Sequence, residues 1–258
     1  MAWWRGVLKL FCSIILVASL ISFVVFISAS AANSEQVLKP AFMSIFESSL
    51  SGNITQENIT LMYDYLNQSC TGESMEFPMG DAENLTLKCS EISSAGASGI
   101  ISLVGSKAFD SFYYSGAKVN PSNLIESIKS NPLSLISKST HDALRTTAFI
   151  FLWISIAMMI AIFFLSVPKL SSFICMGIDF LIAGLLYFLI NGIGPGFIDG
   201  FKLEGQIKDT VMPIAQKLLS EISGLFLALL IIGIALLIAG IVISAILRRK
   251  AKKSSRKK

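Results

Sequence analysis

The sequence predicts an all-α membrane protein with four transmembrane helices and a mostly helical extracytoplasmic domain between helices 1 and 2. The first observation is composition: 53% of the 258 residues are hydrophobic and only 15% are charged, whereas soluble domains carry about 25% charged residues. The second is the presence of four long, nearly uncharged stretches, each long enough to cross a bilayer. The third is a cluster of cations directly behind the last stretch.

Residues 1–32 are predicted to form a cytoplasmic N-terminus and the first transmembrane helix. Arg5 and Lys9 precede an uncharged stretch and hold the N-terminus inside. Small residues at 28–32 resemble a signal peptidase site, so a cleaved signal peptide is the competing interpretation. The apolar part before them is about 17 residues long, more than the 7–15 residues of a usual cleavable core, which favours an uncleaved signal anchor.

Residues 33–145 are predicted to form an extracytoplasmic domain that is mostly helical. Apolar residues recur at three- and four-residue steps over 37–50 and 58–67, and no alternation typical of strands is visible. A short helix over 124–130 and a last helix from Pro132 complete the pattern. The segment has 12 acidic and 7 basic residues, so the net charge of +4 comes from the C-terminal tail.

An extracytoplasmic location leads to two predictions of covalent modification. Cys70 and Cys89, with 18 residues between them, are predicted to form a disulfide, the alternative being two free thiols. Four Asn-x-Ser/Thr sequons are candidate N-glycosylation sites: Asn53, Asn58, Asn67 and Asn84.

Two features of this domain each allow a functional and a structural interpretation. Residues 90–107 are rich in Ser, Gly and Ala and resemble a segment that inserts into a membrane or a partner, but close packing in the domain core is favoured. His141, the one histidine of the chain, precedes the second span together with Asp142 and Arg145. Because no other His or Cys stands at ligand spacing, this cluster is predicted to be a polar collar rather than a metal or catalytic site.

Residues 146–198 are predicted to be a hairpin of the second and third transmembrane helices, joined by a short cytoplasmic turn at 166–172. The Gly-Pro-Gly sequence at 194–196 is predicted to end the third helix. Residues 199–222 are predicted to be an extracytoplasmic amphipathic helix, because apolar residues recur every three or four positions between charged ones.

The fourth span and the tail determine the predicted orientation. Residues 223–247 are uncharged, and as a helix they would be roughly 37 Å long, more than the ~30 Å hydrocarbon core. Eight of the eleven tail residues 248–258 are cations, which marks a cytoplasmic end. We therefore expect a multi-pass protein of the cell membrane with both termini cytoplasmic. The cations predicted to bind anionic lipid headgroups are Arg248, Arg249, Lys250, Lys252, Lys253, Arg256, Lys257 and Lys258.

Asp179 is the one ionisable residue inside a predicted span. A charge in hydrocarbon costs about 2.5–3.5 kcal/mol on insertion scales, so Asp179 is expected to face the bundle or water. The favoured interpretation is a charge clamp between the third and fourth helices, with Lys169, Arg248 or Arg249 as partner. An ion or proton site is the alternative. Asn191, in the same span, is expected to bond across helices or to meet water.

Small residues recur at four- and seven-residue spacing in the fourth span, and such residues allow close helix contact in lipid. This packing face is predicted to meet either the chain's own helices or a second copy in a homo-oligomer. Its residues are Gly224, Ala228, Gly233, Ala235, Ala239, Gly240 and Ser244.

No enzyme motif is recognisable in the sequence, and no metal or cofactor is predicted. We expect a non-enzymatic scaffold or complex subunit that presents its helical domain for protein–protein or cell-envelope interaction. A channel or transporter subunit that uses Asp179 and Asn191 is the alternative, and an enzyme with its site on the outer domain is a third. The expected partners are membrane lipids at the tail and a protein at the outer domain. For the tail, a plain topological stop signal is the default interpretation, and contact with lipid headgroups or with RNA or a ribosome are the alternatives. No nucleic-acid partner is expected.

Overall fold

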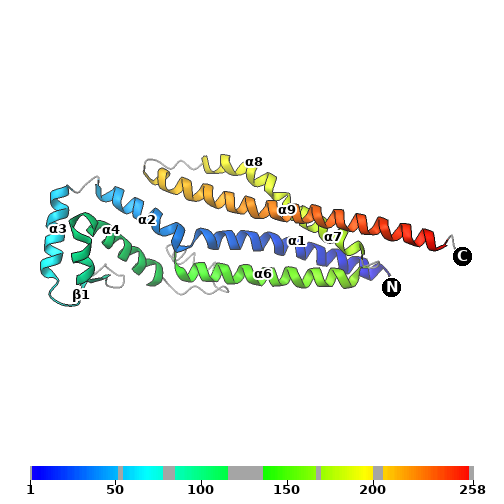
Figure 1. Cartoon of the computed structure of the whole chain (residues 1–258), viewed down its shortest axis with the longest axis horizontal. Helices are drawn as coiled ribbons and strands as arrows, with labels where there is room; N and C mark the ends of the chain where they lie inside the picture. The colour runs from blue at the N-terminus through cyan, green and yellow to red at the C-terminus, as the bar shows by residue number, and fades with distance from the viewer. Residues whose placement is uncertain are drawn as a thin grey trace. The chain divides into compact units, whose positions relative to one another are not determined.

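In the computed structural model of the chain, residues 2–51, 55–77, 85–115, 136–166, 170–199 and 206–255 are described. The elements in chain order are α1 Ala2–Ala32, α2 Glu35–Ser51, α3 Gln56–Ser69, β1 Ser74–Phe77, β2 Leu85–Lys88, α4 Cys89–Ser115, α6 Lys138–Leu165, α7 Leu170–Gly184, α8 Leu186–Asp199 and α9 Gln206–Ser255 (Figure 1). The helix predicted over 124–130 and the predicted helix start at Pro132 lie outside the described residues.

Four helical segments are long and apolar enough to cross a membrane. They contain 26 to 32 residues each, more than the ~20 that a bilayer requires, and they are Trp3–Ala32, Lys138–Leu165, Ser171–Gly196 and Ala215–Ile246. The structure therefore indicates an all-α, multi-pass membrane protein, as composition predicts.

The chain divides into two compact units. Unit 1 contains Met1–Ser28, Leu144–Phe201 and Gln216–Lys258. Unit 2 contains Ala29–Ala143 and Lys202–Ala215. Unit 1 thus holds the greater part of the four apolar helices. Unit 2 covers nearly all of the predicted extracytoplasmic domain, together with part of the predicted 199–222 segment.

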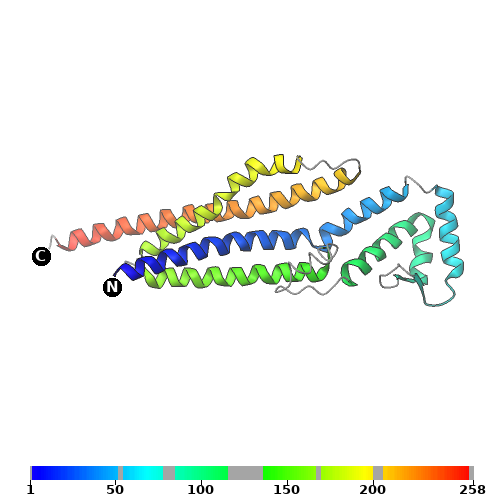
Figure 2. The ribbon, with the colours of Figure 1, turned by 180° about the vertical axis from the view of Figure 1, so that it is seen from behind.

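In unit 1, α1 and α6 run side by side (Figures 1 and 2). The rings of Phe26 and Phe151 stack with their centroids 5.6 Å apart, and the hydroxyl oxygens of Ser19 and Ser155 are 2.7 Å apart. The buried core of this unit combines residues of all four spans: Cys12, Leu16, Leu20, Val24, Ile162, Phe180, Ala183, Phe226 and Leu229.

Glycines bring α7 close to α9. A β-carbon placed on Gly184 would lie 2.5 Å from the amide nitrogen of Leu230, and one placed on Gly233 would lie 2.7 Å from that of Leu181. Ordinary carbon contacts need 3.5–4.0 Å, so no side chain fits at either position. This is the close backbone approach by which helices associate in lipid.

The third span consists of two helices, α7 and α8, with Leu185 between them. The Phe188 amide bonds back only three residues, to the carbonyl of Leu185, at 3.1 Å. The candidate third span ends at Gly196, within the predicted 194–196 boundary, although the helix α8 itself continues through Pro195 to Asp199. Proline removes one helical hydrogen bond. Because Pro195 lies only about one turn before the end of α8, the helix can continue despite this lost bond.

In unit 2, a two-stranded antiparallel sheet accompanies α2, α3 and α4, with Ser74 opposite Lys88 and Phe77 opposite Leu85. Neither strand was identified from the sequence, which predicted a mostly helical domain. Each strand has four residues, too few for their alternation to stand out in the sequence. Side chains of α3, β2 and α4 form the core of the unit: Leu66, Leu85, Leu87, Ile92 and Ile100.

The Ser-, Gly- and Ala-rich segment 90–107 lies within α4. The helix bends at Gly96, whose φ of 62° lies in the left-handed region that favours glycine. At Gly105, a β-carbon would lie 2.6 Å from a ring carbon of Phe46 in α2. Small residues thus let α2 approach α4, in agreement with the interpretation as closely packed core.

The predicted fourth span is part of the 50-residue helix α9. The helical part of the predicted amphipathic segment, from Gln206 onward, continues into that span without a break. The two predicted elements are therefore one helix over the described residues.

Candidate functional site

Asp179 is buried in unit 1, with 2% of its surface exposed. Its Oδ1 accepts a hydrogen bond from the hydroxyl of Ser13 in α1. Near this pair, the ammonium of Lys9 donates to the Ser171 hydroxyl at 3.0 Å. Among the described residues Oδ2 of Asp179 has no hydrogen-bond partner. The observed contact thus joins the first span to the third, whereas the sequence favoured a clamp to the fourth.

The side chains of the three partners predicted for Asp179, namely Lys169, Arg248 and Arg249, lie outside those described. Ser13 was not singled out in the sequence. The spans contain several serines, and the two partners are 166 positions apart, so local spacing carries no signal for this pair.

Asn191 forms the cross-helix bond that was one of its two expected roles. Its amide nitrogen donates to the Ser223 hydroxyl of α9 at 2.8 Å and to the Tyr187 carbonyl of its own helix at 2.9 Å. Asn191 also lines a cavity of about 330 Å³ between α8 and α9. Asn191 and Asp179 therefore have different partners on different helices.

The predicted packing residues of the fourth span divide into two groups. A β-carbon on Gly240 would lie 2.8 Å from Ile174 of α7, so Gly240, like Gly233, lies against the chain's own third span. A β-carbon placed on Gly224 would have no neighbouring atom within 4 Å. The second group consists of predicted packing residues that are exposed or half-exposed in unit 1: Gly224, Ala228, Ala235, Ala239 and Ser244.

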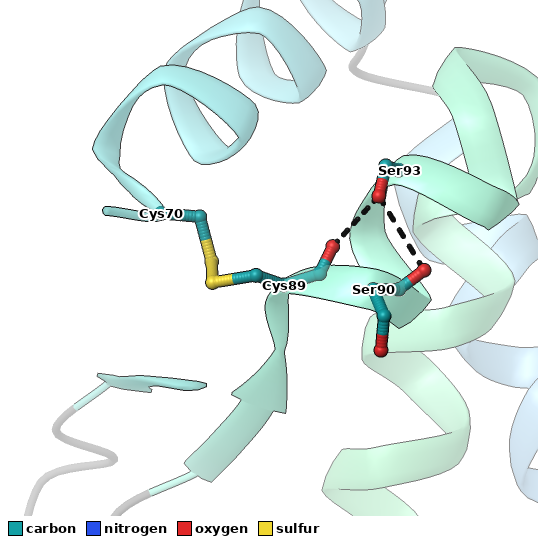
Figure 3. The surroundings of a disulfide bond; sticks show 4 residues. All are labelled: Cys70, Cys89, Ser90 and Ser93. Carbon is teal, nitrogen blue, oxygen red and sulfur yellow. Dashed lines mark hydrogen bonds between the residues drawn. A yellow bond between two sulfur atoms is a disulfide. The ribbon is translucent and has the colours of Figure 1, made fainter. Parts of the chain in front are cut away.

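The predicted disulfide between Cys70 and Cys89 is present in unit 2 (Figure 3). It joins the residue after α3 to the first residue of α4, with the two Cα atoms 5.6 Å apart. The hydroxyl of Ser93 donates to the Cys89 carbonyl at 2.9 Å. The bond therefore connects α3 directly to the helix against which it packs.

Ion pairs connect α2 and α4 of unit 2. Lys39 donates to Asp110 at 2.6 Å and lies 3.6 Å from Glu35; the bond to Asp110 raises the pKa of Lys39. Tyr114 donates to Glu35 at 2.5 Å. That hydrogen bond lowers the pKa of Glu35 and raises the pKa of Tyr114 to about 12.

A second ion pair lies within α4, where Lys107 donates to Glu91 at 2.9 Å. This hydrogen bond lowers the pKa of Glu91, and electrostatic attraction by Lys88 adds to the effect. Lys138 lies over the ring of Tyr114, 5.0 Å from its centroid. Lys39, Lys107 and Lys138 are thus each beside a carboxylate or an aromatic ring of α2 or α4.

The exposed face of α3 differs from the faces of α2 and α4 in its charge, because it has carboxylates without nearby cations in the same segment. Residues 56–77 contain Glu57, Asp64, Glu73 and Glu76 and no Lys or Arg. On this helix Leu61 and Tyr65 are 60% and 66% exposed. Since residues three and four positions apart share a helix face, Glu57, Leu61, Asp64 and Tyr65 form one surface, which we call the α3 face.

Two of the four sequons lie on α3, where Asn58 and Asn67 are both exposed. The side chains of Asn53 and Asn84 lie outside those described. Asn58 precedes Leu61 by three positions and Tyr65 by seven, so it is on the same side of the helix. A glycan on Asn58 would therefore stand beside the α3 face.

The polar collar at the start of α6 is bonded to the end of α1 within unit 2. Nδ1 of His141 lies 2.7 Å from the Ser30 carbonyl, and the Ser30 hydroxyl donates to the His141 carbonyl at 3.1 Å. Tyr113 donates to the Asn33 carbonyl at 2.9 Å. His141 is thus a connecting residue, and no group of His, Cys, Asp and Glu among the described residues could hold a metal ion.

No protein-family model matches the chain, and neither the curated proteins nor the solved structures contain a match.

Proposed function

We propose that the chain is a non-enzymatic scaffold or complex subunit of the cell membrane that presents unit 2 outside the cytoplasm to a protein partner. In this arrangement both termini are cytoplasmic, and the basic tail contacts anionic lipid headgroups. The partner binds the α3 face through a segment that carries Lys or Arg beside apolar side chains.

The observation that carries the proposal is the uneven charge of unit 2. Lys39 and Lys107 are engaged by carboxylates of α2 and α4, and no described ion pair engages Glu57 or Asp64. The α3 face therefore combines two carboxylates that stand outside the described ion pairs with two exposed apolar anchors, Leu61 and Tyr65. Charge complementarity of this kind favours a cationic partner, and aromatic side chains are frequent energetic centres of interfaces.

The proposal includes retention of α1 as an uncleaved anchor. Cleavage after the small residues near Ala32 would remove Leu16, Leu20 and Val24 from the core of unit 1. It would also remove Ser13, the described partner of Asp179. An N-terminal epitope tag should therefore remain on the mature chain, and its loss without loss of the folded protein would contradict the anchor.

The side of the membrane can be tested separately from binding. A Leu61→Cys variant in intact cells should react with a membrane-impermeant maleimide, whereas an Ala251→Cys variant should react only after permeabilisation. In a glycosylating host, the Asn58 and Asn67 sequons should be occupied for the same reason. Labelling of the tail and protection of α3 would reverse the proposed orientation.

Partner binding is tested by placing a photoreactive phenylalanine analogue at Tyr65 of the full chain in its native membrane. The control position is Ser94, an exposed residue of α4. A discrete adduct should form from position 65 and not from position 94. In the same chain, Asp64→Lys should reduce adduct yield about threefold or more, because like charges across an interface are unfavourable.

The matched charge control is Glu47→Lys, which changes net charge equally at an exposed position of α2. It should leave adduct yield nearly unchanged. Equal adducts from both probe positions, or equal effects of both charge variants, would contradict docking at the α3 face.

A channel or transporter subunit remains the second candidate, and it is supported by the buried Oδ2 of Asp179 without a described partner. Intramembrane acids often mark ion or proton pathways. An Asp179→Asn variant separates the two functions. Normal assembly with loss of flux would support transport, whereas altered assembly alone would support a structural role.

A further inference from the structure

A cavity of about 330 Å³ lies in unit 1 between the end of the third span and the start of the fourth. Its size is at the lower end for small-molecule pockets. One wall is formed by Ile190, Asn191 and Pro195 of α8. The other wall is one face of α9, where residues recur at three and four positions: Gln216, Leu219, Ser220 and Ser223.

The described lining has hydrogen-bonding groups but no ionisable side chain. Asn191 already donates to Ser223, which leaves its Oδ1 as an acceptor and the Ser223 proton as a donor. No described hydrogen bond engages the side chains of Gln216 and Ser220. The cavity therefore offers uncharged donors and acceptors beside an apolar surface formed by Ile190, Pro195 and Leu219.

Pro195 makes the backbone carbonyl of Asn191 a further candidate acceptor. It has no amide hydrogen, so the carbonyl of Asn191, four residues earlier, lacks the helical donor that it would otherwise have. An unpaired carbonyl at membrane depth is costly unless another group satisfies it. Pro195 thus removes the usual helical donor from a backbone carbonyl of a residue that lines the cavity.

The location of the cavity narrows the class of ligand. The third candidate span ends at Gly196 and the fourth begins at Ala215, so the walls belong to about the last two turns of one span and the first turns of the other. At this depth lipids present hydroxyl and ester groups, with hydrocarbon on one side and water on the other. A charged headgroup would find no counter-ion among the described lining residues.

We infer that this cavity binds an uncharged membrane lipid through a hydroxyl group, as a sterol or a diacylglycerol could provide. The hydroxyl donates to an acceptor of Asn191 and accepts from Ser220 or Ser223, and the hydrocarbon body lies along Ile190 and Leu219. This site is independent of the partner proposed for unit 2.

The test uses the full chain in membranes with photoreactive sterol and photoreactive diacylglycerol, and a photoreactive phosphatidylcholine as the charged-headgroup control. One of the two hydroxyl lipids should label peptides of α8 or of residues 216–223 more strongly than phosphatidylcholine does. Ser220→Ala should reduce this labelling about two- to tenfold, the range expected for one net hydrogen bond. Ser220→Leu, which fills the cavity, should abolish it.

The matched control is Ser244→Ala, on the same helix but not in the cavity lining. It should leave labelling unchanged, and an unaltered elution profile of each variant shows that it still folds. Preferential labelling by the sterol or by the diacylglycerol identifies the source of the hydroxyl. Equal labelling by all three lipids, or insensitivity to Ser220→Leu, would indicate a water-filled cavity and overturn the inference.

Discussion

The interactions that stabilise unit 1 internally differ from those that stabilise unit 2. The difference fits the solvent expected around each unit, which is lipid for unit 1 and water for unit 2. In unit 1 the helices approach through glycines such as Gly184 and Gly233 and through pairs of small polar side chains such as Ser19 and Ser155. In unit 2 a disulfide, ion pairs and buried leucines connect the elements. Both units contain Ser and Gly in abundance, so composition alone does not produce this difference.

The comparison shows which forces are available in each solvent. Between helices in lipid the hydrophobic effect gives little, because the lipid tails are as apolar as Leu, so close contact and hydrogen bonds decide association. In water a small domain gains from apolar burial and from a covalent link that restricts its unfolded chain. The following predictions test this contrast, beginning with the largest expected effect.

The largest effect is expected for Gly233→Leu. A β-carbon at this position would lie 2.7 Å from the Leu181 amide nitrogen, so α7 and α9 must separate. Overpacking in cores costs about 1–3 kcal/mol and occasionally more, and a backbone neighbour leaves little room to relax. We expect loss of most of the folded chain, measured as the monodisperse fraction in detergent on size-exclusion chromatography.

The matched control is Gly224→Leu on the same helix, because nothing lies within 4 Å of a β-carbon there. It should fold nearly as well as the wild type. If both variants lose the same fraction, close packing against α7 is not what makes Gly233 necessary.

The sequence predicts the spans and the disulfide because both have local signals. Length and lack of charge identify the four apolar stretches, and two cysteines in an otherwise polar segment have few alternatives for pairing. The partner of Asp179 has no such signal, because Ser13 is one of several serines in the spans. Likewise β1 and β2 are too short for their alternation to be recognised, and the helix continues through Pro195 because only one turn follows it.

The α3 face was not identified from the sequence as a candidate binding surface, and the reason differs from those that apply to Ser13 and the two strands. The sequence shows that residues 33–145 are acidic, but only the structure shows which carboxylates are engaged. Lys39 reaches Asp110 on another helix, and Lys107 reaches Glu91, which lies 16 positions earlier on the other side of the bend at Gly96. The remaining negative charge on α3 is therefore a consequence of tertiary pairing.

The second prediction concerns the disulfide of unit 2. Replacing both Cys70 and Cys89 by Ser should destabilise this unit by about 3 kcal/mol, the value that the chain-entropy model gives for a loop of this length. Hydrogen exchange followed by mass spectrometry resolves the two units. Exchange should accelerate in peptides of α3 and α4 and remain unchanged in α7 and α9. Equal acceleration in both sets would mean that the units do not differ in the way described.

The third prediction concerns the buried pair of unit 1. Ser13→Ala removes the one described donor to Asp179 and should cost about 1–3 kcal/mol, the penalty for a buried polar group left unsatisfied. Adding Asp179→Asn should restore part of this loss, because an uncharged amide is less costly to bury. Thermal denaturation in detergent measures both effects. If Ser13→Ala is neutral, another group already stabilises Asp179.

The smallest effect is expected from acid on unit 2. The pKa values of Glu35 and Glu91 are below the ordinary value of 4.5, so their ionised forms stabilise the folded state. This contribution is complete above the ordinary pKa and is lost as pH falls through the lowered one. Because both side chains are more than one-third exposed, the loss for each should be less than about 1 kcal/mol. Hydrogen exchange corrected for its intrinsic pH dependence should show α2 and α4 weakening between about pH 5 and about pH 3, with a smaller change in Glu91→Gln. An identical acid response in that variant would show that the Lys107 pair contributes nothing to the stability of unit 2.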